Sequence, residues 1–254
     1  MPAARVLAIA LAIGGALTPM AFAGAADQLL VHEALTPDRL GRPTNLSLTA
    51  SFSPTSEGVP ERVTKLTVFA PRGLEIDARG AATCSPVALR QRGPGACPAR
   101  ARAGFGGGIG VLQLPSQTIR EDFTLDFFFA STRPGAVSLL AYASAAAPVV
   151  VELVLLAREI PAGDGHGFGF SIEVPPIVTI PDAQPASVES VYASLGAPNV
   201  YYYERVHGRR ALRPLPGLLV PRRCPAGGWV AQATVDFAGG GSLTVNPRIP
   251  CPAR

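Results

Sequence analysis

The sequence predicts an all-β protein, a β-sandwich of mostly antiparallel strands. Apolar and polar residues alternate in several segments, which is the pattern of a strand with one buried face. The 26 prolines and 27 glycines separate these segments at short intervals, as turns separate the strands of a sandwich. Helical periodicity does not recur along the chain. One β-sandwich domain over residues 27–254 accounts for the pattern.

The first residues have the pattern of a cleavable signal peptide. Arg5 precedes an apolar run over residues 6–17, and Ala21-Phe22-Ala23 is the small-x-small triplet that signal peptidase recognises. The run is too short for a stable membrane anchor. We therefore expect residues 1–23 to be removed, with cleavage as late as residue 26, and the mature protein to be secreted or held at the cell surface.

A second apolar stretch, residues 136–157, raises the question of a membrane span. Pro148 and Glu152 lie within it, and an uncompensated carboxylate is costly inside a bilayer. Two buried strands over residues 136–143 and 149–157 explain the stretch better. The mature chain is expected to have no transmembrane segment.

Three further segments alternate clearly enough to be assigned as strands. They are residues 46–52, 123–129 and 229–237. In the last one, Trp229, Val235 and Phe237 share the apolar face. The turn over residues 238–241 and a strand over residues 242–249 would complete a hairpin.

One short helix is expected between Cys84 and Cys97. Ser85 is suited to cap its N-terminus, and Pro86 would occupy the first helical position. Gly93 supplies the residue that ends such a helix in a left-handed conformation.

The four cysteines of an exported chain indicate disulfide bonds. Three pairings are possible. Cys84 with Cys97 and Cys224 with Cys251 is preferred, because each bond then closes a self-contained unit of the chain. The alternative of a zinc site is not favoured, since the spacings contain no Cys-x-x-Cys.

No motif indicates catalysis, a cofactor or a metal, so a non-enzyme is expected. The glycine-rich segments 104–110 and 165–169 lack the spacing and the following helix of a phosphate-binding loop, and turns or glycine-kinked strands are the preferred reading. Glu121, Asp122 and Asp126 could form an acid–base pair, but a solvent-exposed polar row on a strand explains them more simply.

The net charge of +4 comes almost wholly from arginine, because Lys65 is the only lysine. This charge is small for the length of the chain and does not indicate a nucleic-acid partner.

One cluster is a candidate binding face. Aromatic rings and guanidinium groups both suit recognition of an anionic polymer or a carbohydrate of the cell envelope. The candidate residues are Tyr201, Tyr202, Tyr203, Arg205, Arg209, Arg210 and Arg213, continued by Arg222 and Arg223. The alternative is that this segment is an edge strand followed by a solvated loop, with no binding role.

Several short motifs resemble a group of exported proteins from actinobacteria of the Solirubrobacter kind. The motifs are Ala70-Pro71-x-Gly73-Leu74, Thr83-Cys84-Ser85, Leu89, Gly93-Pro94, Ala96-Cys97-Pro98, Gly104, Tyr202-Tyr203-Glu204-Arg205-Val206-x-Gly208-Arg209, Pro221-Arg222-Arg223-Cys224-Pro225 and Pro250-Cys251-Pro252. The resemblance implies an extracellular β protein and supports the local disulfide pairing. It implies no functional residues.

The function that follows from the sequence is broad. We expect a non-enzymatic binding protein or an envelope component, without a cofactor. The alternative is a secreted hydrolase that acts on an extracellular polymer. An enzyme would need titratable groups converging in a pocket, whereas a binding protein needs only a suitable face or cavity.

Overall fold

The computed structural model describes residues 28–54, 58–130, 137–163, 165–180, 183–196, 201–215 and 217–252. The expected signal peptide lies outside the described residues, as does residue 136, where the first of two expected buried strands would begin.

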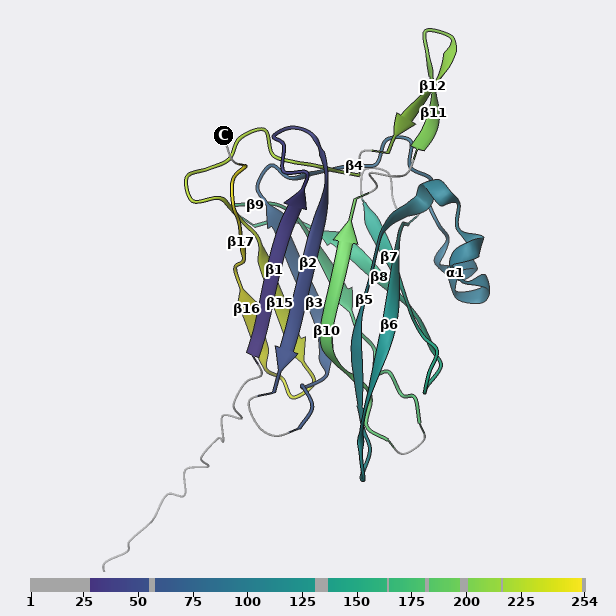
Figure 1. The fold of residues 1–254 in the computed structure, drawn as a ribbon, viewed down its shortest axis with the longest axis vertical. Coiled ribbons are helices and arrows are strands. Elements are labelled where there is room, and N and C mark those ends of the chain that lie inside the picture. Colours follow the sequence, from purple (N-terminus) through teal and green to yellow (C-terminus); the bar gives the residue numbers. More distant parts are fainter. Residues whose placement is uncertain are drawn as a thin grey trace, which may run out of the picture.

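Thirteen strands form one antiparallel sheet that folds over on itself, so that two layers face each other as in a sandwich (Figure 1). The order is β16–β15–β3–β9–β8–β7–β6–β5–β10–β2, with β1 beside β2 at one edge. β13 pairs with the first two residues of β2, and β4 pairs with β13. The sheet is not closed, although its edge strands β1 and β16 contact each other. The predicted all-β sandwich is thus confirmed, with both layers drawn from one sheet.

The two layers contain the following strands. The layer nearer the viewer in Figure 1 holds β1 (Gln28–Thr36), β2 (Pro43–Ser53), β10 (Ser187–Leu195), β5 (Arg102–Gln113) and β6 (Thr118–Phe129). The sheet continues through β7 (Ser138–Ala145) and β8 (Val151–Ile160) to β9 (His166–Glu173), β3 (Val63–Pro71), β15 (Gln232–Phe237) and β16 (Ser242–Val245). The short strands β4 (Glu75–Asp77) and β13 (Gly217–Leu219) pair with each other beyond β2.

The alternation in the sequence places one face of each strand in the interior. On β2, Leu46, Leu48, Ala50 and Phe52 face the interior, and Ser47, Thr49 and Ser51 alternate with them on the other face. On β15, Ala233, Val235 and Phe237 are buried in the same way. β7 and β8 begin and end two to three residues later than expected, but they are the two strands that the apolar stretch predicted.

Both glycine-rich segments are strands, β5 and the start of β9, rather than phosphate loops. A Cβ atom at Gly104, Gly106 or Gly108 would lie 2.1–2.2 Å from a backbone carbonyl oxygen of β10. Glycine is therefore needed in β5 because the two strands approach too closely for any side chain.

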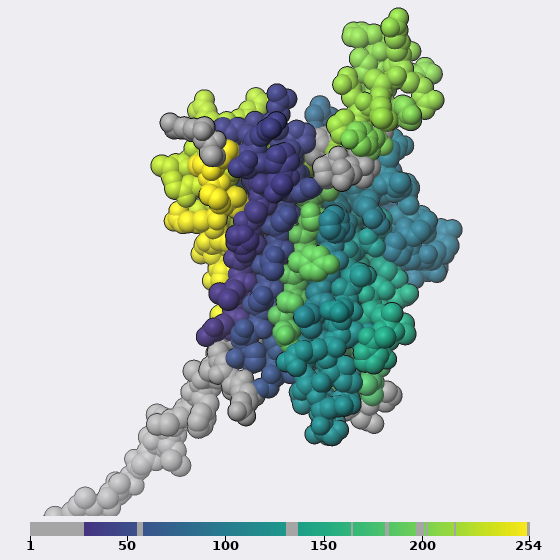
Figure 2. Space-filling model, in the orientation of Figure 1, coloured from purple at the N-terminus to yellow at the C-terminus, as the bar shows by residue number. Residues whose placement is uncertain are grey.

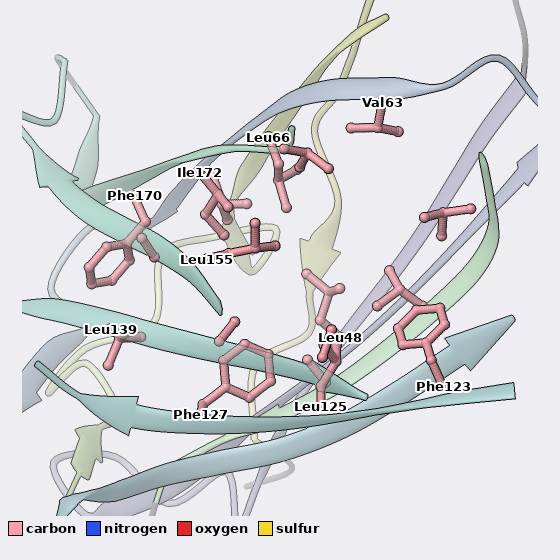
Figure 3. Close-up of a pocket in the computed structure, with 18 of the residues that line it drawn as sticks. Leu48, Val63, Leu66, Phe123, Leu125, Phe127, Leu139, Leu155, Phe170 and Ile172 are labelled. Atoms are coloured by element: carbon pink, nitrogen blue, oxygen red, sulfur yellow. The ribbon is translucent and has the colours of Figure 1, made fainter. Parts of the chain in front are cut away.

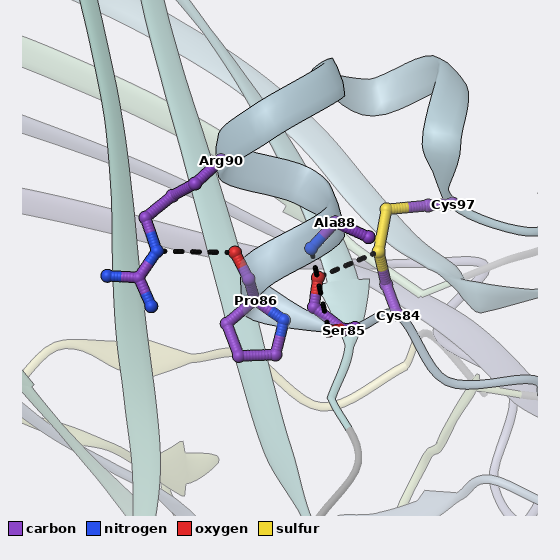
Figure 4. The surroundings of a disulfide bond; sticks show 6 residues. All are labelled: Cys84, Ser85, Pro86, Ala88, Arg90 and Cys97. Atoms are coloured by element: carbon purple, nitrogen blue, oxygen red, sulfur yellow. Dashed lines mark hydrogen bonds between the residues drawn. A yellow bond between two sulfur atoms is a disulfide. The ribbon is translucent and has the colours of Figure 1, made fainter.

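The predicted helix α1 (Pro86–Arg92) packs on the outer face of the sheet (Figure 4). Ser85 caps it by accepting a hydrogen bond from the Ala88 amide, and Gly93 follows its last turn with a φ of 67°. Two 3₁₀ turns, η1 (Pro94–Ala96) and η2 (Ala99–Ala101), lead from the helix into β5. The Cys84–Cys97 disulfide closes this unit, as predicted.

The C-terminal hairpin is interrupted rather than continuous. Its outer part pairs β14 (Trp229–Val230) with β17 (Arg248–Ile249), while β15 and β16 belong to the main sheet. Pro247 lies at the interruption, where a residue without an amide hydrogen cannot complete the ladder. The Cys224–Cys251 disulfide lies at this end, so the second predicted bond is also confirmed.

Candidate functional site: an exposed hairpin and an interior cavity

The tyrosine–arginine cluster forms a two-stranded hairpin that projects from the body of the protein (Figure 2). β11 (Tyr201–Val206) pairs with β12 (Arg209–Pro214) across a turn at His207 and Gly208. Both turn residues have positive φ, 50° and 80°, as the tight turns favoured in hairpins require. The side chain of Tyr202 lies outside the described part of the chain.

One face of the hairpin gathers aromatic and basic groups. Tyr201 and Tyr203 are more than half exposed, and the Arg210 guanidinium lies 4.5 Å from the centre of the Tyr203 ring. Arg205 is directly opposite Arg210 in the strand register. Two like charges facing each other across strands destabilise a hairpin, so an anion bound between them would relieve this repulsion.

Arg213, Arg222 and Arg223 have other surroundings. Arg213 contacts the carboxylate of Glu204, at 3.6 Å, on the opposite face of the hairpin. Arg222 lies beside Gly41, and the carbonyl of Arg223 accepts a hydrogen bond from the Trp229 indole. The structure therefore does not extend the arginine cluster beyond the hairpin.

The acidic residues of β6 do not converge on one pocket. Asp122 is exposed, and Asp126 forms an ion pair with Arg102 at 2.8 Å. Glu121 lies on the other face of the strand and accepts weak hydrogen bonds from the Val149 amide. Asp122 and Asp126 thus form the outward polar row that the alternation predicts.

An apolar cavity of about 330 Å³, which no pattern in the sequence predicts, lies between the two layers (Figure 3). Side chains from both layers point into it, among them Phe123 and Phe127 of β6, Leu155 of β8, and Phe170 and Ile172 of β9. Protein interiors rarely contain voids much larger than a water molecule. A cavity of this size is comparable to the smaller binding sites for organic ligands.

The cavity exists because inward positions on adjoining strands carry small residues. On β7 the lining positions after Leu139 are Ala141, Ala143 and Ala145. On β5, Gly110 lines the space without a side chain. These small residues leave space beside the large side chains that β6, β8 and β9 direct into the cavity.

Two carboxyl groups belong to this mainly apolar lining, Glu33 and Glu121, and Glu33 is the more deeply buried. Glu33 of β1 is 2% exposed and shares the inward face of its strand with Leu29, Val31 and Leu35. Neither carboxyl oxygen has a hydrogen-bond partner among the described residues. Burial raises the pKa of Glu33 from 4.5 to about 7, because the charged form is poorly solvated in this environment.

Two other ionisable groups with altered pKa differ from Glu33 in having partners. A hydrogen bond from Arg79 holds the pKa of Asp77 below its ordinary value, against the opposing effect of burial. Burial and then Glu152 raise the pKa of Tyr142. Glu33 therefore stands apart from both as a buried carboxyl without a compensating group.

Most other polar lining groups lie at one end of the cavity. Glu121, Ser144, Thr179 and Ser187 come from the region where the β7–β8 turn and the β9–β10 connection meet the start of β6. Val150 and Val178 are largely exposed at this end, at 76% and 65%. An apolar molecule would meet a favourable surface here before it entered the interior.

The sequence contained a signal for Glu33. Leu29, Val31 and Leu35 belong to a clear alternating row of four inward positions, and the third of these positions is Glu33. A charged residue at an inward position of a strand is unusual, because Glu is almost never fully buried without a partner.

Within the described ranges, no group of three or more metal-binding side chains occurs, and no helix is long and apolar enough to cross a membrane. No protein-family model, curated protein or solved structure matches this chain.

Proposed function

We propose that this is a non-enzymatic extracellular protein that binds a small, mainly apolar molecule in the cavity between its layers. The observation that carries the proposal is the apolar cavity of about 330 Å³, bordered by side chains from both layers. The two disulfide bonds are compatible with an extracellular location.

The energetic cost of such a cavity supports a binding role. Cavities left in protein cores destabilise by about 24 cal/mol per Å³, so a space of about 330 Å³ corresponds to a cost on the order of 8 kcal/mol. Larger side chains at Ala141 and Ala143 could reduce this cost. Alanine at these positions instead keeps the space open, as a ligand-binding cavity requires.

Binding of decanol tests the proposal, because this molecule is apolar along its length and carries no charge. We expect the protein to bind it with a stoichiometry near one, measured by isothermal titration calorimetry below the solubility limit. The double variant Ala141→Leu/Ala143→Leu should lower the affinity at least tenfold, because its side chains occupy the cavity.

Ala99→Leu is the matched control, since it adds an apolar side chain at an exposed position outside the cavity. It should bind like the parent. Absence of decanol binding by the parent, or equal binding by the parent and the double variant, would refute the cavity as a binding site.

The hairpin supports a second binding function, directed at an anionic polymer of the envelope. The cross-strand pair of Arg205 and Arg210 and the exposed rings of Tyr201 and Tyr203 are the features that favour it. Exposed charge contacts weaken with salt, since the Debye length falls from about 10 Å at 0.1 M to about 3 Å at 1 M.

The double variant Arg205→Ala/Arg210→Ala should lose most of the salt-sensitive binding to purified cell wall, because it removes both arginines of this face. Its melting temperature should be nearly unchanged, since both side chains are exposed. A double variant that binds like the parent, or that unfolds, would leave the hairpin with a structural role only.

A further inference from the structure

The position of Glu33 narrows the chemistry of the ligand. The alternation of side chains along β1 directs the Glu33 side chain to the interior, where it joins a mainly apolar lining. Both of its oxygens are buried and have no hydrogen-bond partner among the described residues. A buried polar group without a partner is costly, so a ligand that donates hydrogen bonds at this point would gain affinity.

We propose that Glu33 is the head-group site of the cavity and that the ligand is an amphipathic amine, an apolar body bearing a basic nitrogen. This inference rests on the proposed function, since it concerns the same cavity. The protonated amine would donate to the carboxylate, and the apolar body would contact the aliphatic and aromatic lining.

The charge distribution of the cavity favours a cation over an anion. The lining includes two ionisable side chains, Glu33 and Glu121, and both are acidic. Among the described lining residues there is no lysine, arginine or histidine to neutralise them. An ammonium group has three donors and forms a charge-assisted hydrogen bond with a carboxylate, whereas an acidic ligand would place a second negative charge beside Glu33.

The strands packed against β1 provide no alternative partner for Glu33. β2 and β16 carry no ionisable residue. β17 carries Arg248, whose side chain is exposed and donates to the carbonyl of Gly227. Across the interior, β3 carries Lys65, β9 carries His166 and Glu173, and β15 carries Asp236. None of these four lines the cavity, and Lys65 pairs with Glu173.

Binding of an amine should depend on pH in a definite direction. With a pKa of about 7, Glu33 is mostly protonated at pH 5 and mostly ionised at pH 8. A long-chain amine remains protonated at both values, because the pKa of such amines is about 10. If the carboxylate form binds, affinity should rise from pH 5 to pH 8, by up to about 100-fold.

Calorimetric titration with decylamine, decanol and decanoate, below their micelle concentrations, tests the inference. At pH 8 we expect decylamine to bind at least tenfold more tightly than decanol, and decanoate to bind least. Glu33→Gln should weaken decylamine binding at least tenfold and abolish its dependence on pH, while decanol binding changes less than twofold. Glu75→Gln, at an exposed position on β4, is the matched control and should behave like the parent.

The three ligands separate the two proposals. If the parent binds decanol but shows no preference for decylamine, or if Glu33→Gln leaves that preference intact, the head-group assignment is wrong and the cavity remains a binding site. If none of the three ligands binds, the proposed function itself is wrong. Unchanged decanol binding by Glu33→Gln also shows that the variant is folded.

Discussion

The two faces of strand β7 differ in how completely they are packed. On the outer face, Leu140 and Tyr142 are buried in a cluster with Leu89 of α1 and Phe128 of β6, and the Cys84–Cys97 disulfide borders it. On the inner face, Ala141 and its neighbouring alanines leave space in the interior. The same strand thus borders one densely packed cluster and one cavity.

The contrast shows that the cavity does not result from a general shortage of large apolar residues. The outer cluster reaches an exposed fraction of 0% at both Leu89 and Leu140. The interior has large residues on β6, β8 and β9, but alanines on β7, which lies between β6 and β8 in the sheet. The choice of residue at a few inward positions therefore separates a structural cluster from a candidate binding site.

The largest expected difference between the two faces is in how much a Leu→Ala substitution lowers the free energy of unfolding. Leu140→Ala should lower the free energy of unfolding by about 4 kcal/mol, because it creates a new enclosed space in a filled cluster. Leu155→Ala, at the cavity lining, should cost about 2 kcal/mol, since that side chain already borders open space. Chemical denaturation measures both, and equal losses would contradict the difference in packing.

The next effect concerns Glu33 and the dependence of stability on pH. Its pKa is about 7 in the folded protein and 4.5 in the absence of burial, so the folded state binds this proton more strongly than the unfolded state. Protonated Glu33 therefore contributes to the stability of the folded state. This contribution is complete below about pH 4.5 and is lost as the pH rises to about 7. At about 1.36 kcal/mol for each pKa unit, the loss amounts to about 3 kcal/mol.

Glu33→Gln should remove this loss of stability with rising pH, because glutamine does not ionise. The stability of the parent relative to the variant should therefore fall by about 3 kcal/mol between pH 4 and pH 8, as measured by denaturation at each pH. Parallel pH profiles for the two proteins would show that Glu33 is solvated or paired in solution.

Local rules predicted much of the fold. Alternation identified β2, β6 and β15, and the Ser85, Pro86 and Gly93 signals identified α1 because capping depends on adjacent residues. The prediction of the two local disulfide bonds depends only on short units of the chain that each fold locally, and both bonds are present. The candidate binding hairpin was recognised as a cluster, although its strand register and its separation from Arg222 required the structure.

The cavity could not be predicted from the sequence, because it depends on which strands face each other. Ala141 and Phe170 are on strands that are not adjacent in the chain, and only the folded sheet brings both to one space. Glu33 could have been noticed as a charged residue in an apolar row. Whether it met a partner across the interior was a matter of tertiary structure.

The measurement that tests the central claim most directly is the stability of the Ala141→Leu/Ala143→Leu variant, because it probes the cavity without any ligand. A cavity of about 330 Å³ can accept the added side chains, so the free energy of unfolding in denaturant should be unchanged or higher than in the parent. In a filled core, added side chains typically cost about 1–3 kcal/mol for each site through strain. A loss of that size would show that the interior is fully packed and would contradict the account.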